Sequence, residues 1–185
     1  MLSKVTSCGL SGIDGYIVSV ETDISNGLPA FDIVGLADMA VREAKERVRA
    51  AIRNSGFEFP SQRITVNLAP ADLKKEGTSY DLPIAAGVLS ATGIIPPGFF
   101  NDSLLCGELS LDGTLRPVCG VLSKTIAARD NGVKRIIVPS ENAYEAAVVK
   151  GIRVIPVKNL AELVLYAKGE AEIIPVEEEW DKHAA

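Results

Sequence analysis

Residues 63–92 read RITVNLAPADLKKEGTSYDLPIAAGVLSAT and contain a strand, a polar loop and a buried helix in direct succession. Apolar and polar side chains alternate over 63–68, which predicts a strand with one buried face. Residues 81–92 are apolar on nearly every side, so they predict a helix enclosed by the core, with Asp81 as its cap and Pro83 in its first turn. The polar loop at 69–80 connects the two.

The segments on either side complete the fold. Before this stretch we expect a hairpin of strands 4–10 and 16–24, a strand at 29–36 and an amphipathic helix at 38–55 that begins at Asp38. After it, Asp112-Gly113 predicts a hairpin of 104–109 with 113–118. The remaining elements alternate as helix 119–131, strand 135–138, helix 141–149, strand 152–156 and helix 159–168. This order predicts a mixed α/β (α+β) fold with an antiparallel first half and βαβ crossovers in the second.

Length and composition favour one soluble domain. The chain has 185 residues, of which 47% are hydrophobic, and no apolar stretch approaches the ~20 residues that span a bilayer. The N-terminus has no basic-then-apolar leader, so we expect a cytoplasmic protein without a membrane partner. Three cysteines without C-x-x-C spacing predict reduced thiols and no metal site.

The net charge of −5 is concentrated in the tail. Residues 169–185 hold six acidic residues against Lys182 alone, and the rest of the chain carries 18 charges of each sign. The tail is therefore expected to be an acidic linker, 169–185, after a domain at 1–168. Since the body is neutral, the overall charge does not exclude nucleic acid as a partner.

Several kinds of chemistry are excluded. The single histidine is His183, in the tail, so the body has no Ser-His-Asp triad and no histidine metal site. Residues 118–125 end in Lys-Thr like a P-loop, but Val118 and Ser123 occupy the two glycine positions, which excludes a nucleotide site there. We expect no cofactor and no metal in this chain.

Ser79 is a weak catalytic candidate. It precedes a predicted buried helix, where a hydroxyl can be exposed beside aligned backbone amides, although serine in such a place is commonly a simple cap. A hydrolase in this chain would need a lysine as its base, because no histidine is available.

Four long segments of this chain resemble the N-terminal domain of the Mg-chelatase-like AAA+ ATPases, the ComM/YifB family linked to competence and DNA recombination. They are 5–15 (VTSCGLSGIDG), 27–38 (GLPAFDIVGLAD), 63–85 (RITVNLAPADLKKEGTSYDLPIA) and 107–118 (GELSLDGTLRPV). The resemblance covers nearly all of residues 3–168. It implies a fold like the second domain of ribosomal protein S5, which the proteolytic domain of Lon shares.

The same resemblance bears on Ser79. In Lon-like proteases the catalytic serine lies in a K-D-G-P-S-A-G segment, which residues 75–81 resemble, with Ser79 at the nucleophile position. The lysine of the P-I-G-G-L-K-E-K pattern aligns with Leu122. Lys124, two residues further, is about 200° around the helix and is expected to face away. We therefore expect Ser79 to be a structural remnant, with a Lon-like Ser-Lys peptidase as the alternative.

Basic side chains on the 38–55 helix and in the following loop are the candidates for binding DNA or a partner: Arg42, Lys45, Arg49, Arg53, Lys74 and Lys75. Acidic residues lie between the basic ones, so this side of the helix is also consistent with a solvated face that binds nothing.

The resemblance implies a homo-hexameric parent protein whose ATPase module, with its ATP and Mg²⁺, follows residue 185. Porphyrin chelation by this chain is not supported, because its body has no histidine, no metal-ligand cluster and few aromatic residues.

Overall fold

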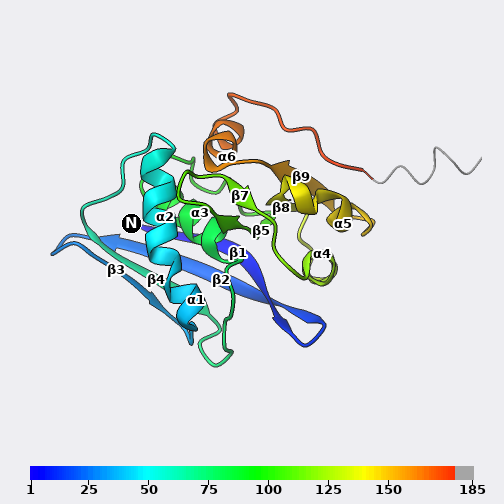
Figure 1. Ribbon diagram of the computed structural model, residues 1–185, viewed down its shortest axis with the longest axis horizontal. Helices are drawn as coiled ribbons and strands as arrows, with labels where there is room; N and C mark the ends of the chain where they lie inside the picture. Colours follow the sequence, from blue (N-terminus) through cyan, green and yellow to red (C-terminus); the bar gives the residue numbers. More distant parts are fainter. Residues whose placement is uncertain (178–185) are drawn as a thin grey trace, which may run out of the picture.

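A computed structural model describes residues 1–177 and shows a seven-stranded sheet with helices on both faces (Figure 1). The strand order is β3-β4-β2-β1-β5-β8-β9, and β6 and β7 form a separate two-stranded ribbon. The strands are β1 (Leu2–Ser11), β2 (Asp14–Ser25), β3 (Ala30–Val34), β4 (Arg63–Ala69), β5 (Ser103–Leu105), β6 (Glu108–Leu109), β7 (Leu115–Arg116), β8 (Arg135–Pro139) and β9 (Arg153–Val157). The helices are α1 (Met39–Arg42), α2 (Ala44–Asn54), α3 (Asp81–Ala91), α4 (Val121–Asp130), a 3-10 turn η1 (Ser140–Asn142), α5 (Ala143–Ala147) and α6 (Leu160–Ala167).

Two apolar clusters lie on opposite faces of the sheet. The larger one joins alternate strand residues such as Val20, Ile64 and Leu105 to α2, α3 and α6. The smaller one joins their neighbours, such as Leu104 and Val138, to α4 and α5. Because α4 and α5 cover only one half of their face, the other half, on β2, β3 and β4, carries exposed or half-buried residues.

The sheet is mixed, as the order of elements predicts. β1 and β2 form a long antiparallel hairpin, and β2 continues antiparallel to β4. In the second half, β5, β8 and β9 are all parallel, which confirms the expected βαβ crossovers. The prediction that the first half is antiparallel is wrong for one pair of strands. β3 runs parallel to β4, because α1 and α2 form a crossover between them.

Two predicted elements are interrupted. The helix expected at 38–55 is divided at Glu43 into α1 and α2. The strand expected at 104–109 divides as well: β5 joins the main sheet, whereas β6 pairs with β7 in the predicted hairpin.

The chain stays in contact with the body after α6. Ile173 packs against the larger cluster and Val176 against the smaller one. The Val176 amide donates to the Val154 carbonyl of the edge strand β9 at 3.0 Å. The first part of the expected linker thus lies against the sheet, and Trp180 and His183 lie outside the described residues.

Within residues 1–177, no helix has the length and apolar character needed to cross a bilayer.

Candidate functional site

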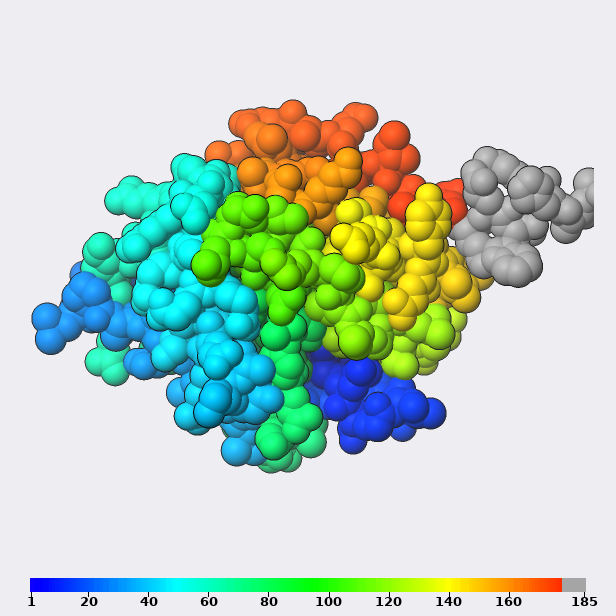
Figure 2. All heavy atoms as spheres, viewed as in Figure 1, coloured from blue at the N-terminus to red at the C-terminus, as the bar shows by residue number. Residues whose placement is uncertain are grey.

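Ser79 lines a cavity of about 350 Å³ at one end of the sheet, which we call the Ser79 cavity. Three segments meet there: the β1–β2 hairpin, the loop before α3 and the start of α4. In Figure 2 they lie close together, coloured blue, green and yellow-green. The lining residues are Gly9, Leu10, Tyr16, 76–80, 117–119 and Lys124.

Two glycines allow the hairpin to approach its neighbours this closely. A β-carbon on Gly9 would lie 2.5 Å from the Tyr16 hydroxyl and 2.7 Å from that of Tyr80, and one on Gly15 would lie 2.7 Å from the β-carbon of Ala127 in α4. A side chain at either position would have to displace these atoms. The glycines at 9 and 15 are thus packing positions beside the cavity.

Lys124 lies in the same cavity as Ser79, so the expectation that it faces away is wrong. The residue is 4% exposed and lines the cavity, whereas Leu122, aligned with the Lon lysine, is 39% exposed and does not line it. The reason is the position of the helix: Val121, Lys124, Thr125 and Ala128 form the buried side of α4, and Lys124 is on its first turn. A helical-wheel argument predicts angles around the axis but not which side meets the sheet.

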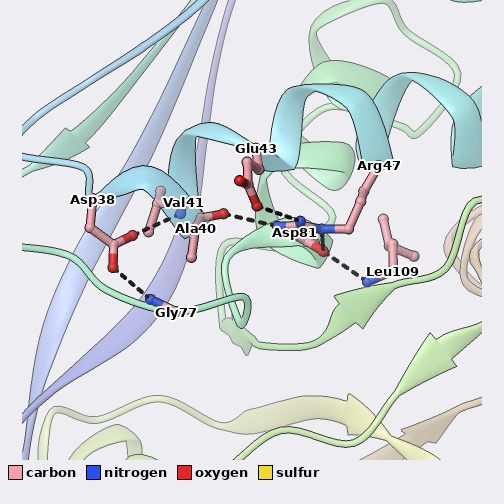
Figure 3. A network of polar contacts seen from close by, with 8 residues as sticks. All are labelled: Asp38, Ala40, Val41, Glu43, Arg47, Gly77, Asp81 and Leu109. Carbon is pink, nitrogen blue, oxygen red and sulfur yellow. Dashed lines mark hydrogen bonds and ion pairs between the residues drawn. The ribbon is translucent and has the colours of Figure 1, made fainter.

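The loop that carries Ser79 is held on its N-terminal side by Asp38. One carboxylate oxygen of Asp38 accepts from the amide of Val41 at 2.8 Å, which confirms the predicted cap. The other oxygen accepts from the amide of Gly77 at 3.4 Å (Figure 3). A single carboxylate therefore connects the start of α1 to the Ser79 loop.

Asp81 fixes the C-terminal side of that loop. Its carboxylate is fully buried and accepts from Arg47 Nε at 2.7 Å, from Arg47 Nη2 at 3.0 Å and from the amide of Leu109 at 3.0 Å (Figure 3). Arg47 also donates to the Ala40 carbonyl at 3.0 Å. Burial raises the pKa of Asp81, and its bonds to Arg47 and Leu109 oppose that rise. Asp81 is thus the first residue of α3 and an ion-pair partner rather than a cap.

Sequence reasoning missed this ion pair. Arg47 lies among the basic candidates of its helix, but its side chain is only 20% exposed. A signal was present: Asp81 begins an otherwise apolar helix, and a buried carboxylate needs a cation. Nothing in the sequence says which of the neighbouring arginines supplies it.

Lys75 is removed from the set of DNA-binding candidates by the structure. The residue is 0% exposed, and its ammonium donates to the Gly35 carbonyl at 2.9 Å and to the Pro70 carbonyl. Burial lowers the pKa of Lys75. Its neighbour Lys74 is exposed and pairs with Glu76 at 3.3 Å.

Arg49 and Arg53 are brought together at a second hollow, of about 300 Å³, which we call the Phe59 cleft. Both guanidinium groups lie over the Phe59 ring, 5.6 Å and 5.8 Å from its centroid. Arg49 also pairs with Glu46 at 3.3 Å, whereas Arg53 makes no ion pair with any of residues 1–177. Of the other candidates, Arg42 is exposed and Lys45 half-buried, and neither lines the cleft.

In the described part of the chain, no three acidic, cysteine or histidine side chains cluster as a metal site would require.

Comparison with known proteins places the chain in a family. The family described as subunit ChlI of Mg-chelatase matches residues 20–142. The chain belongs to this family. It is 45% identical over 168 residues to the uncharacterised protein Rv2897c of Mycobacterium tuberculosis, 39% over 184 residues to competence protein ComM of Haemophilus influenzae and 40% over 169 residues to YifB of Escherichia coli. These alignments cover 91%, 100% and 91% of this chain and 33%, 36% and 33% of the relatives.

The ChlI family member described here therefore spans about a third of the length of the curated relatives it matches. A further similarity, to Lon protease 2 of Bacillus subtilis, is 34% identical over 122 residues and covers 64% of the chain and 21% of that protein. Both the resemblance to Mg-chelatase-like proteins and the Lon-like, S5-like fold predicted from the sequence are confirmed.

Proposed function

We propose that this chain is the non-catalytic N-terminal accessory domain of a Mg-chelatase-like AAA+ ATPase that acts in DNA processing. It supplies contacts between subunits of a homo-hexamer and contacts to DNA, in the cytoplasm. ATP and Mg²⁺ are bound by an ATPase module of the same polypeptide outside this chain. Family membership and the printed name of the relative ComM, a competence protein, support this proposal.

The Phe59 cleft is the observation that carries the DNA contact. Arg49 and Arg53 flank an aromatic ring beside Gln62 and the backbone of the β3 edge. Guanidinium groups bind phosphate in a bidentate manner, and arginine above an aromatic ring offers a surface on which a base can stack. Arg53, which has no acidic partner in residues 1–177, is the better donor to phosphate of the two.

Fluorescence anisotropy with labelled single-stranded and branched DNA tests the proposal over a series of salt concentrations. We expect Arg49→Gln/Arg53→Gln to weaken binding by about tenfold or more and to reduce the salt slope by about one to two, because each lost phosphate contact releases fewer counterions. Arg153→Gln is the matched control, since Arg153 is exposed at the start of β9, far along the sheet from β3. Absence of binding even at low salt would leave only the role in subunit contacts.

A second candidate is a Lon-like Ser-Lys hydrolase that uses Ser79. The observation in its favour is that Ser79 and Lys124 line one cavity, so a nucleophile and a lysine base are available together. A serine-reactive covalent probe and a peptidase assay decide between the two candidates. Labelling that is lost in Ser79→Ala and in Lys124→Met would establish the hydrolase. Labelling that persists in Ser79→Ala would remove Ser79 as its nucleophile.

A further inference from the structure

Lys124 is a buried cation without an anionic partner in the described chain. The residue is 96% buried, and its ammonium makes no hydrogen bond or ion pair with residues 1–177. Of the side-chain nitrogen and oxygen atoms in these residues, only Thr22 Oγ1 is both sealed from solvent and unpartnered. The ammonium therefore keeps some access, and the Ser79 cavity is the space that Lys124 lines.

Neither the thiols that feel the charge of Lys124 nor the acidic residue of the cavity forms an ion pair with it. Its charge is felt by the thiols of Cys8 and Cys106, but burial raises the pKa of each to about 11, so both are neutral thiols at physiological pH. Glu76 is the one acidic residue lining the cavity, and its exposed carboxylate pairs with Lys74 at 3.3 Å. A buried charge is normally paired, since removing an ion from water is costly.

The starts of two helices border the same cavity. Tyr80 and Gly120 are the residues that precede α3 and α4, both border or adjoin the cavity, and neither supplies a side-chain cap. The helices have 11 and 10 residues, long enough to place a partial positive charge at their N-termini. Each helix start also has a carboxylate beside it: Asp81 in the first turn of α3, and Glu145, which accepts from the Leu122 amide of α4 at 3.2 Å. Lys124 is therefore the main positive group of the cavity. Its apolar walls come from Leu10, Pro117 and Val118.

We propose that the Ser79 cavity binds a small ligand through a carboxylate or phosphate group, with Lys124 as the counter-ion and the apolar walls around the body of the ligand. A volume of about 350 Å³ suits a small molecule. The inference does not depend on the proposed contact with DNA, which uses a different surface, and it requires no reaction at Ser79.

An NMR titration of the ¹⁵N-labelled chain with sodium phosphate and, separately, with sodium butyrate tests the proposal and distinguishes the two anion classes. We expect saturable shifts of the Gly9, Gly77 and Cys119 amides with at least one of them. Lys124→Met keeps the length of the side chain and should weaken this binding by about tenfold or more, because it removes the charge. The surface control Arg153→Gln should retain it.

A second variant tests the proposal in case Lys124→Met does not fold. Cys119 is exposed and lines the cavity, so Cys119→Phe should fill the space and abolish the shifts with little effect on folding. No saturable shift with either anion would overturn the proposal, and so would equal affinity in a folded Lys124→Met. Loss of binding in Ser79→Ala alone would assign the cavity to the serine rather than to Lys124. Anisotropy with DNA, measured on the same variants, shows separately whether the proposed function holds.

Discussion

Arg47 and Lys75 show how the burial of a single side chain changes the role of its charge. Both occur in runs of basic residues, yet Arg47 forms a bidentate pair with a buried carboxylate and Lys75 donates to two backbone carbonyls. Arg53, in the same helix as Arg47, remains at the surface beside Phe59. For these side chains, the hydrogen-bond and ion-pair partners, and not the residue type, decide whether a cation is internal or available to a ligand.

Arg47→Met should lower the free energy of unfolding by about 3–5 kcal/mol at neutral pH, because Asp81 would be left buried with only the Leu109 amide as a partner. Burial already raises the pKa of Asp81, and loss of Arg47 would raise it further in the folded state. The variant would then bind a proton on folding, so its deficit should shrink as the pH falls through that raised pKa. Urea unfolding between pH 5 and 8 measures this. A deficit that does not change with pH would contradict the assignment, and Arg42→Met, at an exposed site, is the control.

The loop between β4 and α3 is the element on which the candidate site depends. It is held on both sides of Ser79 from the α1–α2 region, by Asp38 at Gly77 and by Arg47 at Asp81 (Figure 3). The division of the predicted helix at Glu43 belongs to the same arrangement: Arg47 reaches back to the carbonyl of Ala40 and approaches Glu43 at 3.9 Å. Two short helices in place of one long helix thus position the Ser79 loop.

Asp38→Ala should cost about 1 kcal/mol of stability, the usual value of an N-cap, and should also release Gly77. We therefore expect faster amide hydrogen exchange at residues 77–79 with little change in α2. Asp32→Ala, on the exposed side of β3, is the matched control. Unchanged exchange in the Ser79 loop would show that Asp38 only caps α1.

At the scale of the whole molecule, the sheet has one open edge and one edge covered by the chain itself. β3 is unpaired on its outer side in the described structure, whereas β9 pairs with the segment around Val176. The Phe59 cleft lies beside the β3 edge, and the Ser79 cavity lies where β1, β2 and α4 meet. The two candidate surfaces are therefore separate and can be altered independently.

Truncation after residue 168 should lower the stability by about 1–2 kcal/mol, because Ile173 and Val176 no longer bury apolar surface and β9 loses a backbone bond. Truncation after residue 177 retains these contacts and is the reference for the comparison. Thermal unfolding followed by circular dichroism compares the two. Equal melting temperatures would mean that the segment after α6 contributes no stability.

The order of elements and the mixed sheet follow from the sequence alone, because hydrophobic periodicity, caps and turn residues act locally along the chain. Asp38 was identified as a cap for this reason. The family followed from the resemblance of four long segments to known proteins. Which cations are free depends on the tertiary structure. Lys75 proved buried, Lys124 proved to share a cavity with Ser79, and Arg47 proved to pair with Asp81 across 34 positions. Such contacts depend on which face of each helix meets the sheet, and that is set by the packing of distant segments rather than by neighbouring residues.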